Sequence, residues 1–288
     1  MGFILTLSCP DRPGIVSAVT NFLVQHNLNI IDSSQYGDPT SHTFFMRMHF
    51  GPDTTGSSDA SSPSLESLRK AFEPIATAHS MSFQLLPADH KPRVLIMVSK
   101  IGHCLNDLLF RHSTGQLAIE IPLIVSNHPE FAQLAATYKV PFMHLPVTPD
   151  TKQQQETRIL ELIKEYEIEL VVLARYMQVL SPTLCEAMSG KIINIHHSFL
   201  PSFKGAKPYH QAYDRGVKLV GATAHFVTSD LDEGPIIEQN VVRVNHALSP
   251  KELTHAGSNV ESNVLAEAVK YFAQRRVLLN GHKTVVFN

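Results

Sequence analysis

Residues 93–98 are Arg-Val-Leu-Ile-Met-Val, and residues 170–174 are Leu-Val-Val-Leu-Ala. A strand with one face in water alternates apolar and polar side chains, whereas these segments are apolar at nearly every position. Such strands are covered on both faces, which is typical of a parallel sheet between two layers of helices. Segments with helical periodicity separate them from further apolar segments, so we predict a doubly wound, mostly parallel α/β domain.

The elements expected in this domain alternate between strand and helix as far as residue 196. We expect strands at 93–98, 118–125, 142–145, 170–174, 192–196, 220–228 and 236–244, and helices at 104–111, from 129, and at 152–166, 182–188 and 250–276. The end of the chain departs from the alternation, because two strands follow one another across a polar loop before a long helix. In sheets of this kind, chemistry takes place at the carboxyl ends of the strands.

The first 86 residues predict a separate, ferredoxin-like domain with the order βαββαβ. Ile15, Val19, Phe22 and Leu23 have the spacing of one helix face. Strands are expected at 3–8, 29–36, 43–50 and 82–86, and a second helix at 65–79. The stretch Pro-Ala-Asp-His-Lys-Pro interrupts both helix and sheet. We therefore expect domains at 1–86 and 93–288, joined by a linker at 87–92.

The composition is that of a globular protein, since 43% of the 288 residues are hydrophobic. Lys plus Arg number 24 and Asp plus Glu number 26, so the net charge is −2. This charge does not indicate a protein that binds nucleic acid or an anionic membrane. No apolar run approaches the roughly 18 residues of a membrane-spanning helix. The three cysteines are far apart in the sequence, which indicates a reducing, cytoplasmic compartment rather than a disulfide framework.

The segment Ile-Asn-Ile-His-His-Ser-Phe-Leu-Pro at 193–201 ends an apolar strand and carries the most informative polar residues. Side chains alternate along a strand, so Asn194 and His196 point the same way. An amide donor and an imidazole on one face can bind one carbonyl oxygen and move one proton. His197 is expected on the opposite face, which argues against a metal held jointly by His196 and His197.

A second polar cluster, Ser-Asp-Leu-Asp-Glu-Gly-Pro at 229–235, lies in the loop between two strands. Asp, Gly and Pro are ordinary turn residues, so this loop has a purely structural interpretation. The loop has a functional interpretation if one of its carboxylates reaches His196, because such a pair fixes the tautomer of the imidazole.

Three motifs occur in order between residues 194 and 234: Asn-x-His-x-Ser-x-Leu-Pro, then Ser-Phe-Lys-Gly-Ala-Lys-Pro, then Gly-Ala-Thr-Ala-His-Phe-Val-Thr-Ser-Asp-Leu-Asp-Glu-Gly. Together with Leu-Ala-Arg-Tyr-Met-Gln-Val-Leu-Ser at 173–181, they resemble the folate-dependent formyltransferase family. The resemblance covers residue 93 to about residue 272. It implies that Asn194, His196 and Asp232 are catalytic and that neither metal nor cofactor is needed.

The N-terminal stretch Leu-Thr-Leu-Ser-Cys-Pro-Asp-Arg-Pro-Gly-Ile-Val resembles an ACT domain, a small ligand-sensing module. Combined with the segments at 44–47 and 98–109, it resembles the family branch that hydrolyses 10-formyltetrahydrofolate to formate and tetrahydrofolate. Transferases acting on a phosphorylated acceptor carry a Gly-rich loop after the first strand. Here that position is Ser-Lys-Ile-Gly-His-Cys at 99–104, which favours water as the nucleophile.

The resemblance also implies binding residues. The pterin is expected against the loops 173–180 and 227–234, with Met177 and Leu180 as apolar walls, although a core role for Met177 is a serious alternative. The remaining candidates from the resemblance are Gly205, His225, Val227 and Gly234, and for His225 a role as a packed strand histidine is an equal alternative. Arg175 is a candidate for the glutamate tail on its charge alone. Asp11 and Gly14 are expected to bind an amino-acid effector, glycine or methionine, in a homo-oligomer. The alternative is that the ACT-like domain serves oligomerisation only.

In catalysis, Asn194 is expected to donate to the formyl oxygen, while Asp232 and His196 jointly activate water. Which of the two holds the proton at each step stays open. Three other functions remain alternatives: a formyltransferase with an unidentified acceptor, a non-catalytic folate- or amino-acid-binding regulator, and a zinc hydrolase.

Overall fold

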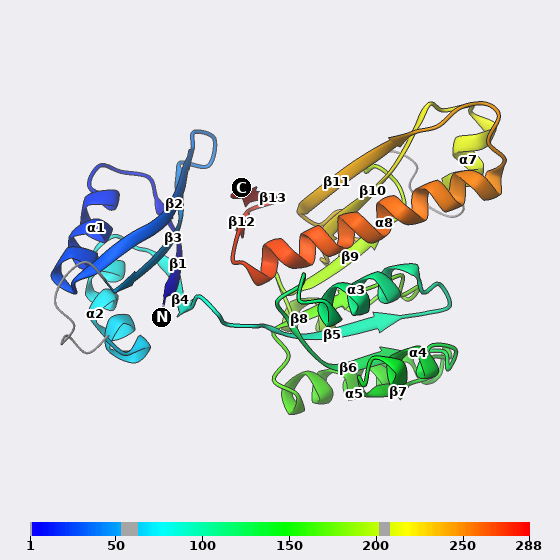
Figure 1. The fold of residues 1–288 in the computed structure, drawn as a ribbon, viewed down its shortest axis with the longest axis horizontal. Helices are drawn as coiled ribbons and strands as arrows, with labels where there is room; N and C mark the ends of the chain where they lie inside the picture. The colour runs from blue at the N-terminus through cyan, green and yellow to red at the C-terminus, as the bar shows by residue number, and fades with distance from the viewer. Residues whose placement is uncertain (1, 53–62, 202–207) are drawn as a thin grey trace. The chain divides into compact units, whose positions relative to one another are not determined.

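The computed structural model describes residues 2–52, 63–201 and 208–288. They form two compact units, and most of the first is coloured blue to cyan in Figure 1 while most of the second is coloured cyan to orange. The first unit contains the chain up to His90 together with Arg275–Asn280 and Val285–Asn288, and the second contains Lys91–Gln274 and Gly281–Thr284. We expected residues 93–288 to form one domain, whereas the C-terminal residues divide between the two units.

The first unit has the predicted βαββαβ order. Its elements are β1 (Phe3–Pro10), α1 (Ile15–Gln25), β2 (Leu28–Asp38), β3 (Thr43–Pro52), α2 (Leu65–Ala78) and β4 (Ser82–Pro87). The sheet is antiparallel, with the strand order β2-β3-β1-β4. Ser64 caps α2 by accepting a hydrogen bond from the Ser67 backbone N–H, and the helix begins at Leu65 as expected.

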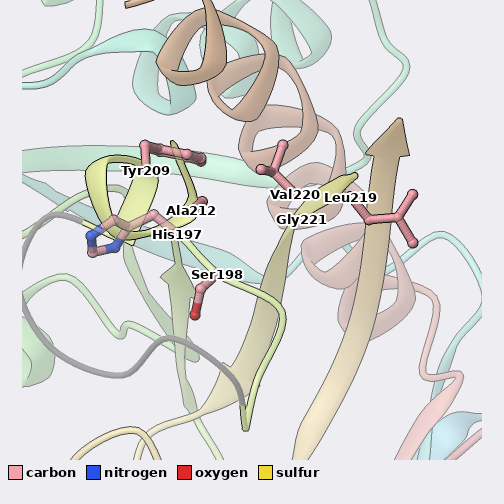
Figure 2. Close-up of a pocket in the computed structure, with 7 residues that line it drawn as sticks. All are labelled: His197, Ser198, Tyr209, Ala212, Leu219, Val220 and Gly221. Carbon is pink, nitrogen blue, oxygen red and sulfur yellow. The ribbon is translucent and has the colours of Figure 1, made fainter. Parts of the chain in front are cut away.

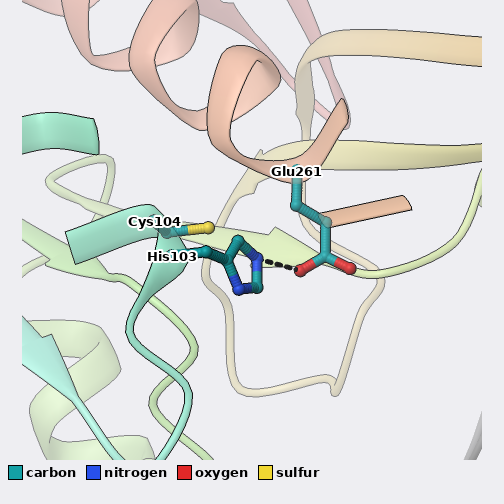
Figure 3. Close-up of side chains that lie close together, drawn as sticks. All are labelled: His103, Cys104 and Glu261. Carbon is teal, nitrogen blue, oxygen red and sulfur yellow. Dashed lines mark hydrogen bonds and ion pairs between the residues drawn. The ribbon is translucent and has the colours of Figure 1, made fainter. Parts of the chain in front are cut away.

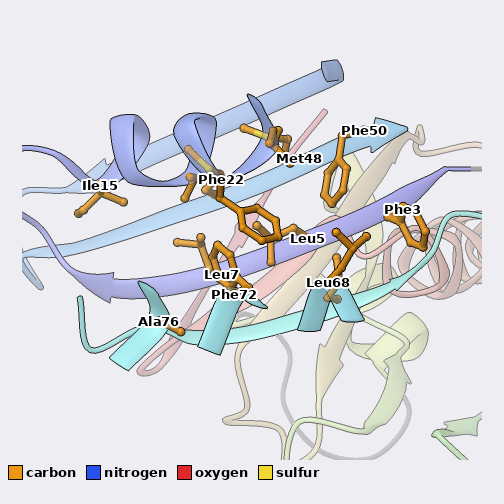
Figure 4. Close-up of a cluster of buried hydrophobic side chains, with 14 of the residues drawn as sticks. Phe3, Leu5, Leu7, Ile15, Phe22, Met48, Phe50, Leu68, Phe72 and Ala76 are labelled. Atoms are coloured by element: carbon orange, nitrogen blue, oxygen red, sulfur yellow. The ribbon is translucent and has the colours of Figure 1, made fainter. Parts of the chain in front are cut away.

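The core of this unit lies between its sheet and its two helices (Figure 4). Leu5 and Leu7 on β1 point toward the helices because side chains on a strand alternate between faces. Phe72 of α2 is fully buried and lies edge-on to Phe22 of α1, with ring centroids 5.1 Å apart. These contacts bury the apolar stripe of each helix and fix both helices on one face of the sheet.

The second unit is built on a seven-stranded sheet with the order β11-β10-β9-β8-β5-β6-β7. Its strands are β5 (Arg93–Val98), β6 (Glu120–Ser126), β7 (Phe142–His144), β8 (Leu170–Leu173), β9 (Ile192–His196), β10 (Leu219–Phe226) and β11 (Ile236–Arg243). Strands β5 to β9 pair in parallel, whereas β10 is antiparallel to both β9 and β11. The order reverses between β5 and β8, which is where α/β sheets of this type place their ligands.

Helices cover both faces of this sheet (Figure 1). They are α3 (His103–Ser113), α4 (Ala132–Thr137), α5 (Lys152–Glu165), α6 (Pro182–Ala187), α7 (Pro208–Asp214) and α8 (Pro250–Ala273). Helix α8 packs against α3, β9, β10 and β11, while α5 and α6 bury apolar residues against alternate residues of β5 and β8 on the other face. The doubly wound, mostly parallel architecture is confirmed.

Three elements were not anticipated from the sequence. They are the short helix α7 and the hairpin strands β12 (Val277–Asn280) and β13 (Lys283–Val286). Helix α8 ends at Ala273, three residues before the expected end, and α4 begins at Ala132 rather than at 129. Across the described ranges, every helix is too short or too polar to cross a bilayer.

Replacing Phe72 with Ala removes the ring that fills the centre of the first unit. We expect this to lower the free energy of unfolding by about 3–5 kcal/mol, because the cavity cannot fully collapse. Urea denaturation followed by circular dichroism measures the loss. Val24→Ala on α1 is the control, since Val24 is 72% exposed and its truncation is expected to change stability by about 0.5 kcal/mol at most. Equal losses in the two variants would contradict the assignment of Phe72 to the core.

Candidate active site

The polar residues of the motif meet where β9 pairs with β10. In the antiparallel register His196 lies opposite Thr223, and Asn194 lies opposite His225. A pair of directly opposed residues shares one face of the sheet, so the Asn194 and His225 side chains point the same way. The structure therefore brings Asn194, His196 and His225 to one side of the sheet at the carboxyl end of β9.

The loop after β10 adds a carboxylate to this cluster. Asp232 Oδ1 lies 3.3 Å from His196 Nδ1 and 3.8 Å from His225 Nε2. Asp232 has a φ of 58°, a left-handed conformation that non-glycine residues adopt at a cost of about 1–3 kcal/mol. The close approach of Gly234 to Phe226 holds the loop, because a Cβ at Gly234 would lie 1.7 Å from the Phe226 carbonyl oxygen. Backbone packing thus places the carboxylate beside the imidazole.

The contact between Asp232 and His196 sets the charge of one group and the tautomer of the other. Hydrogen bonding to His196 holds the pKa of the Asp232 carboxyl below its ordinary value of 3.8, although burial opposes this. An ionised carboxylate only accepts, so Nδ1 of His196 carries the proton and Nε2 carries the lone pair. His196 is 5% exposed, and no residue in the described part of the chain forms a hydrogen bond with its Nε2.

His225 orients the amide of Asn194. Its Nδ1 lies 2.8 Å from the Phe226 carbonyl oxygen, so Nδ1 donates and Nε2 accepts. Asn194 Nδ2 is 3.2 Å from that Nε2 and donates one of its two hydrogens to it. Burial lowers the pKa of His225, which keeps the ring neutral at pH 7. The arrangement fixes the orientation of the Asn194 side chain and leaves its second N–H available.

The turn after β9 is held by Thr223, a residue that sequence reasoning missed. Thr223 is fully buried, donates from Oγ1 to the Ser198 carbonyl and accepts from the Leu200 backbone N–H at 3.0 Å. Gln239 on β11 donates to the same Oγ1 at 2.9 Å. The signal in the sequence was a lone hydroxyl residue inside the apolar strand Val-Gly-Ala-Thr-Ala-His-Phe.

The two loops expected to hold the pterin contribute both exposed and buried residues. Met177 is 56% exposed, which sets aside the alternative of a core role, whereas Leu180 is 8% exposed and packs in the core beneath its loop. Val227 is half-buried, and its N–H donates to the Ile192 carbonyl at 2.9 Å. Gly205 lies outside the described residues.

Arg175 turns inward rather than toward solvent. Its side chain is 8% exposed, and its Nε lies 3.5 Å from Oε2 of Glu261 on α8. This geometry gives no support to the expected contact between Arg175 and a glutamate tail, because the guanidinium is already paired and buried. The ion-pair partner of Arg175 is Glu261, a residue that no motif in the sequence singled out.

His103, Cys104 and Glu261 each place one ligand atom within 4.8 Å of the others (Figure 3). This set fits a metal poorly. Burial raises the pKa of the Cys104 thiol well above its ordinary value, so the thiolate that binds metals is disfavoured. The oxygen of Glu261 that faces His103 is also the one that faces the Arg175 guanidinium. We therefore interpret the cluster as an ion-pair network.

A small cavity lies beside His197, between Tyr209 and Gly221 (Figure 2). Its volume is about 20 Å³, which is room for about one water molecule. Burial, followed by the charge of Arg175, lowers the pKa of His197 to about 4, so this ring is neutral at pH 7. The cavity is far too small for a folate, and the substrate must bind elsewhere.

Comparison with known proteins identifies the family of each unit. The family model for formyl transferase matches residues 92–269, and the model for the ACT domain matches residues 3–57. A crystal structure of phosphoribosylglycinamide formyltransferase from Anaplasma phagocytophilum is 32% identical, with a TM-score of 0.63, and covers 69% of this chain and 96% of that one. The catalytic unit is therefore that of a formyltransferase-fold enzyme.

Relatives that match nearly the whole chain identify the family within this class of enzymes. Formyltetrahydrofolate deformylase of Corynebacterium sp. (strain P-1) is 51% identical over 284 residues, covering 98% of this chain and 97% of the relative. The crystal structure of formyltetrahydrofolate deformylase from Burkholderia mallei is 52% identical, with a TM-score of 0.94, and covers 100% of this chain and 99% of that one. The chain belongs to the formyltetrahydrofolate deformylase family and is an enzyme of the hydrolase class.

The pairing of Asp232 with His196 can be tested by titration. Replacing His196 with Ala is expected to raise the pKa of the Asp232 carboxyl, because burial then acts with less compensation. In the wild type, the stability from this pair is present above pH 3.8 and is lost as the pH falls through the lower pKa of the folded protein. Carbon-13 NMR titration of the Asp232 carboxyl measures its pKa in both proteins, and urea denaturation at a series of pH values measures the loss of stability.

His210→Ala, at an exposed histidine of α7, is the control and is expected to leave that titration unchanged. An Asp232 pKa that is the same in His196→Ala and in the wild type would contradict the pairing.

Proposed function

We propose that the chain hydrolyses 10-formyltetrahydrofolate to formate and tetrahydrofolate, with Asn194, His196 and Asp232 as its catalytic residues. The observation that carries this proposal is the state of His196. Its Nδ1 is paired with Asp232, and its buried Nε2 is without a hydrogen-bond partner in the described ranges. General-base catalysis requires an imidazole that is oriented by a partner at one nitrogen and keeps a lone pair at the other nitrogen to accept a proton.

Water is the nucleophile in this mechanism. Its oxygen adds to the formyl carbon while His196 Nε2 takes its proton, and Asp232 stabilises the imidazolium that forms. The C–N bond then breaks, and the same proton passes from Nε2 to the departing nitrogen of tetrahydrofolate. In this proposal His196, rather than Asp232, carries the proton at each step. Such acid–base catalysis contributes about 10²–10⁴-fold to the rate.

Asn194 stabilises the negative charge that develops on the formyl oxygen. One N–H of its amide is held by His225, and the second donates to the oxyanion. One donor of this kind contributes roughly 3–4 kcal/mol to transition-state stabilisation. His225 acts through Asn194 and is therefore a positioning residue. The mechanism uses neither metal nor cofactor, and the folate is the substrate.

The loops around this cluster offer apolar surface for the pterin. Met177 and Leu231 are 56% and 65% exposed and belong to the loops after β8 and β10. Exposed apolar side chains on two loops that flank polar groups are typical of a site for an aromatic ligand. Gly234 and Val227 supply backbone groups on the second loop. The free, buried thiols of Cys9, Cys104 and Cys185 favour a reducing, cytoplasmic location.

Purified protein incubated with 10-formyltetrahydrofolate alone is expected to release formate. Asp232→Asn and His196→Ala are each expected to lower the rate of release at least a hundredfold, because one loses the carboxylate and the other loses the base. Binding of tetrahydrofolate is expected to persist in both variants. A coupled formate assay measures turnover, and calorimetry measures binding.

Asp230→Asn, in the same loop, is the matched control and is expected to leave turnover within about twofold of the wild type. Formation of tetrahydrofolate that requires an added acceptor and yields a formylated acceptor without formate would favour a formyltransferase instead. Near-normal turnover in both catalytic variants would overturn the assignment, and turnover proportional to bound zinc would favour a zinc hydrolase.

The first unit is proposed to bind an amino acid, glycine or methionine, at Asp11 and Gly14 in a homo-oligomer. Gly14 precedes α1 with a left-handed φ of 95°, and no side chain in the described ranges caps the first turn. Uncapped N–H groups attract a carboxylate, and Asp11 offers a partner for an ammonium group. Asp11 is held in place by its backbone N–H, which donates to the His42 carbonyl at 2.8 Å.

Glycine or methionine at millimolar concentration is expected to raise the melting temperature of the wild type and leave that of Asp11→Asn unchanged, because the variant lacks the ammonium partner. Differential scanning calorimetry measures the shift, and analytical ultracentrifugation measures the oligomeric state. Alanine and lysine serve as ligand controls. Identical melting temperatures with and without amino acid would leave oligomerisation as the role of this unit.

A further inference from the structure

A single carboxylate joins four segments of the second unit. Glu261, in the middle of α8, is 1% exposed. Its Oε2 accepts from His103 Nε2 at 2.8 Å and lies 3.5 Å from Arg175 Nε, while its Oε1 accepts from the Tyr209 hydroxyl at 2.5 Å (Figure 3 shows the contact with His103). Although burial opposes ionisation, the hydrogen bond from His103 and the charge of Arg175 hold the pKa of Glu261 below its ordinary value.

The fold makes room for this arrangement. Gly257 lies one helical turn before Glu261, and a Cβ there would lie 2.0 Å from the Tyr209 hydroxyl oxygen. The Tyr209 ring therefore crosses α8 at Gly257 to reach the carboxylate. A buried charge is costly unless it is paired and hydrogen-bonded, and Glu261 has three such partners from α3, α7 and the loop after β8.

Arg175 is the member of this network that belongs to the substrate loop. Its φ of 64° is left-handed, a conformation that an arginine keeps only where its surroundings hold it. The Ser99 backbone N–H donates to the Arg175 carbonyl at 3.2 Å, and the Met177 N–H donates to Ser99 Oγ at 2.9 Å. Within residues 174–177, the ion pair with Glu261 is the contact that anchors the Arg175 side chain.

This loop begins directly beside the catalytic strand. Leu173, the last residue of β8, pairs with Asn194 of β9 in the parallel register. Arg175 therefore lies two residues beyond Leu173, the strand partner of the proposed catalytic residue Asn194. Met177, which is exposed, lies two residues further along the chain. A change in the Arg175 backbone would move the apolar wall of the substrate site relative to Asn194.

We propose that Glu261 is a positioning residue for the proposed reaction: by pairing with Arg175, it fixes the backbone of residues 174–177 in the shape that receives the folate. This rests on the proposed function for the identity of the ligand. Glu261 does not touch the substrate, so its effect is on substrate affinity rather than on the chemical step.

Glu261→Gln tests the proposal, because it keeps the shape of the side chain and removes the charge that holds Arg175. We expect KM for 10-formyltetrahydrofolate to rise at least fivefold and kcat to stay within about threefold. Glu267→Gln on the same helix is the matched control, since Glu267 pairs with Lys270 near the surface. Its KM is expected to stay within about twofold of the wild type.

A rescue distinguishes positioning from a general loss of structure. In the double variant Glu261→Gln with Arg175→Gly, glycine adopts the left-handed conformation without an anchor, and no unpaired charge remains. Its KM is expected to be less than half that of Glu261→Gln alone. Should Glu261→Gln not fold, the double variant is still expected to fold and to keep KM within fivefold of the wild type.

Three results would each overturn the proposal. The first is a rise in KM below fivefold in a folded Glu261→Gln, and the second is a fall in its kcat without a rise in KM. The third is a double variant whose KM is as high as that of Glu261→Gln. The same samples are titrated with tetrahydrofolate by calorimetry, with the same fivefold threshold for Kd. A wild type that binds tetrahydrofolate but releases no formate refutes the proposed function, while the Kd ratios still decide the role of Glu261.

Discussion

The antiparallel pairing of β9 with β10 is the constraint on which the site depends. It sets His225 opposite Asn194, so that one ring can orient the amide, and it turns the chain back so that the following loop passes over His196. Antiparallel pairing also places β11 beside β10, so the loop between these two strands, residues 227–235, stays close to the side chains of Asn194, His196 and His225. The carboxylate of Asp232 comes from this loop and contacts His196 and His225.

Two groups of buried charges lie next to each other at this end of the sheet. Asp232 is paired with His196 and lies near His225, and Glu261 is paired with Arg175 and His103. In each group hydrogen bonds keep the carboxylate ionised, and at Glu261 the charge of Arg175 adds to them, because burial alone would favour the neutral acid. The first group is suited to moving a proton, since one nitrogen of His196 has no partner in the described ranges. In the second group both oxygens of Glu261 accept hydrogen bonds and Arg175 is held by an ion pair, which suits this group to holding backbone in place.

Several features of the fold followed from local sequence patterns. Uniformly apolar segments at 93–98 and 170–174 predicted strands buried on both faces, and the alternation with helical periodicity predicted their parallel pairing. The order βαββαβ was equally clear from spacing and turn residues. Helix α7 was missed because its seven residues lie within a motif with no helical periodicity of its own. The C-terminal hairpin was missed because two four-residue strands give too short a pattern.

Local patterns were sufficient for the fold class, since periodicity is a local property of the chain, and the family resemblance of the motifs supplied the candidates Asn194, His196 and Asp232. Only the three-dimensional contacts show that the Asp232 carboxylate reaches His196, and that Arg175 turns toward Glu261 instead of solvent. The physical reason is that contacts between distant segments depend on strand register, on the left-handed backbone at Asp232 and Arg175, and on the space left by Gly234 and Gly257. None of these can be read from the spacing of residue types along the chain.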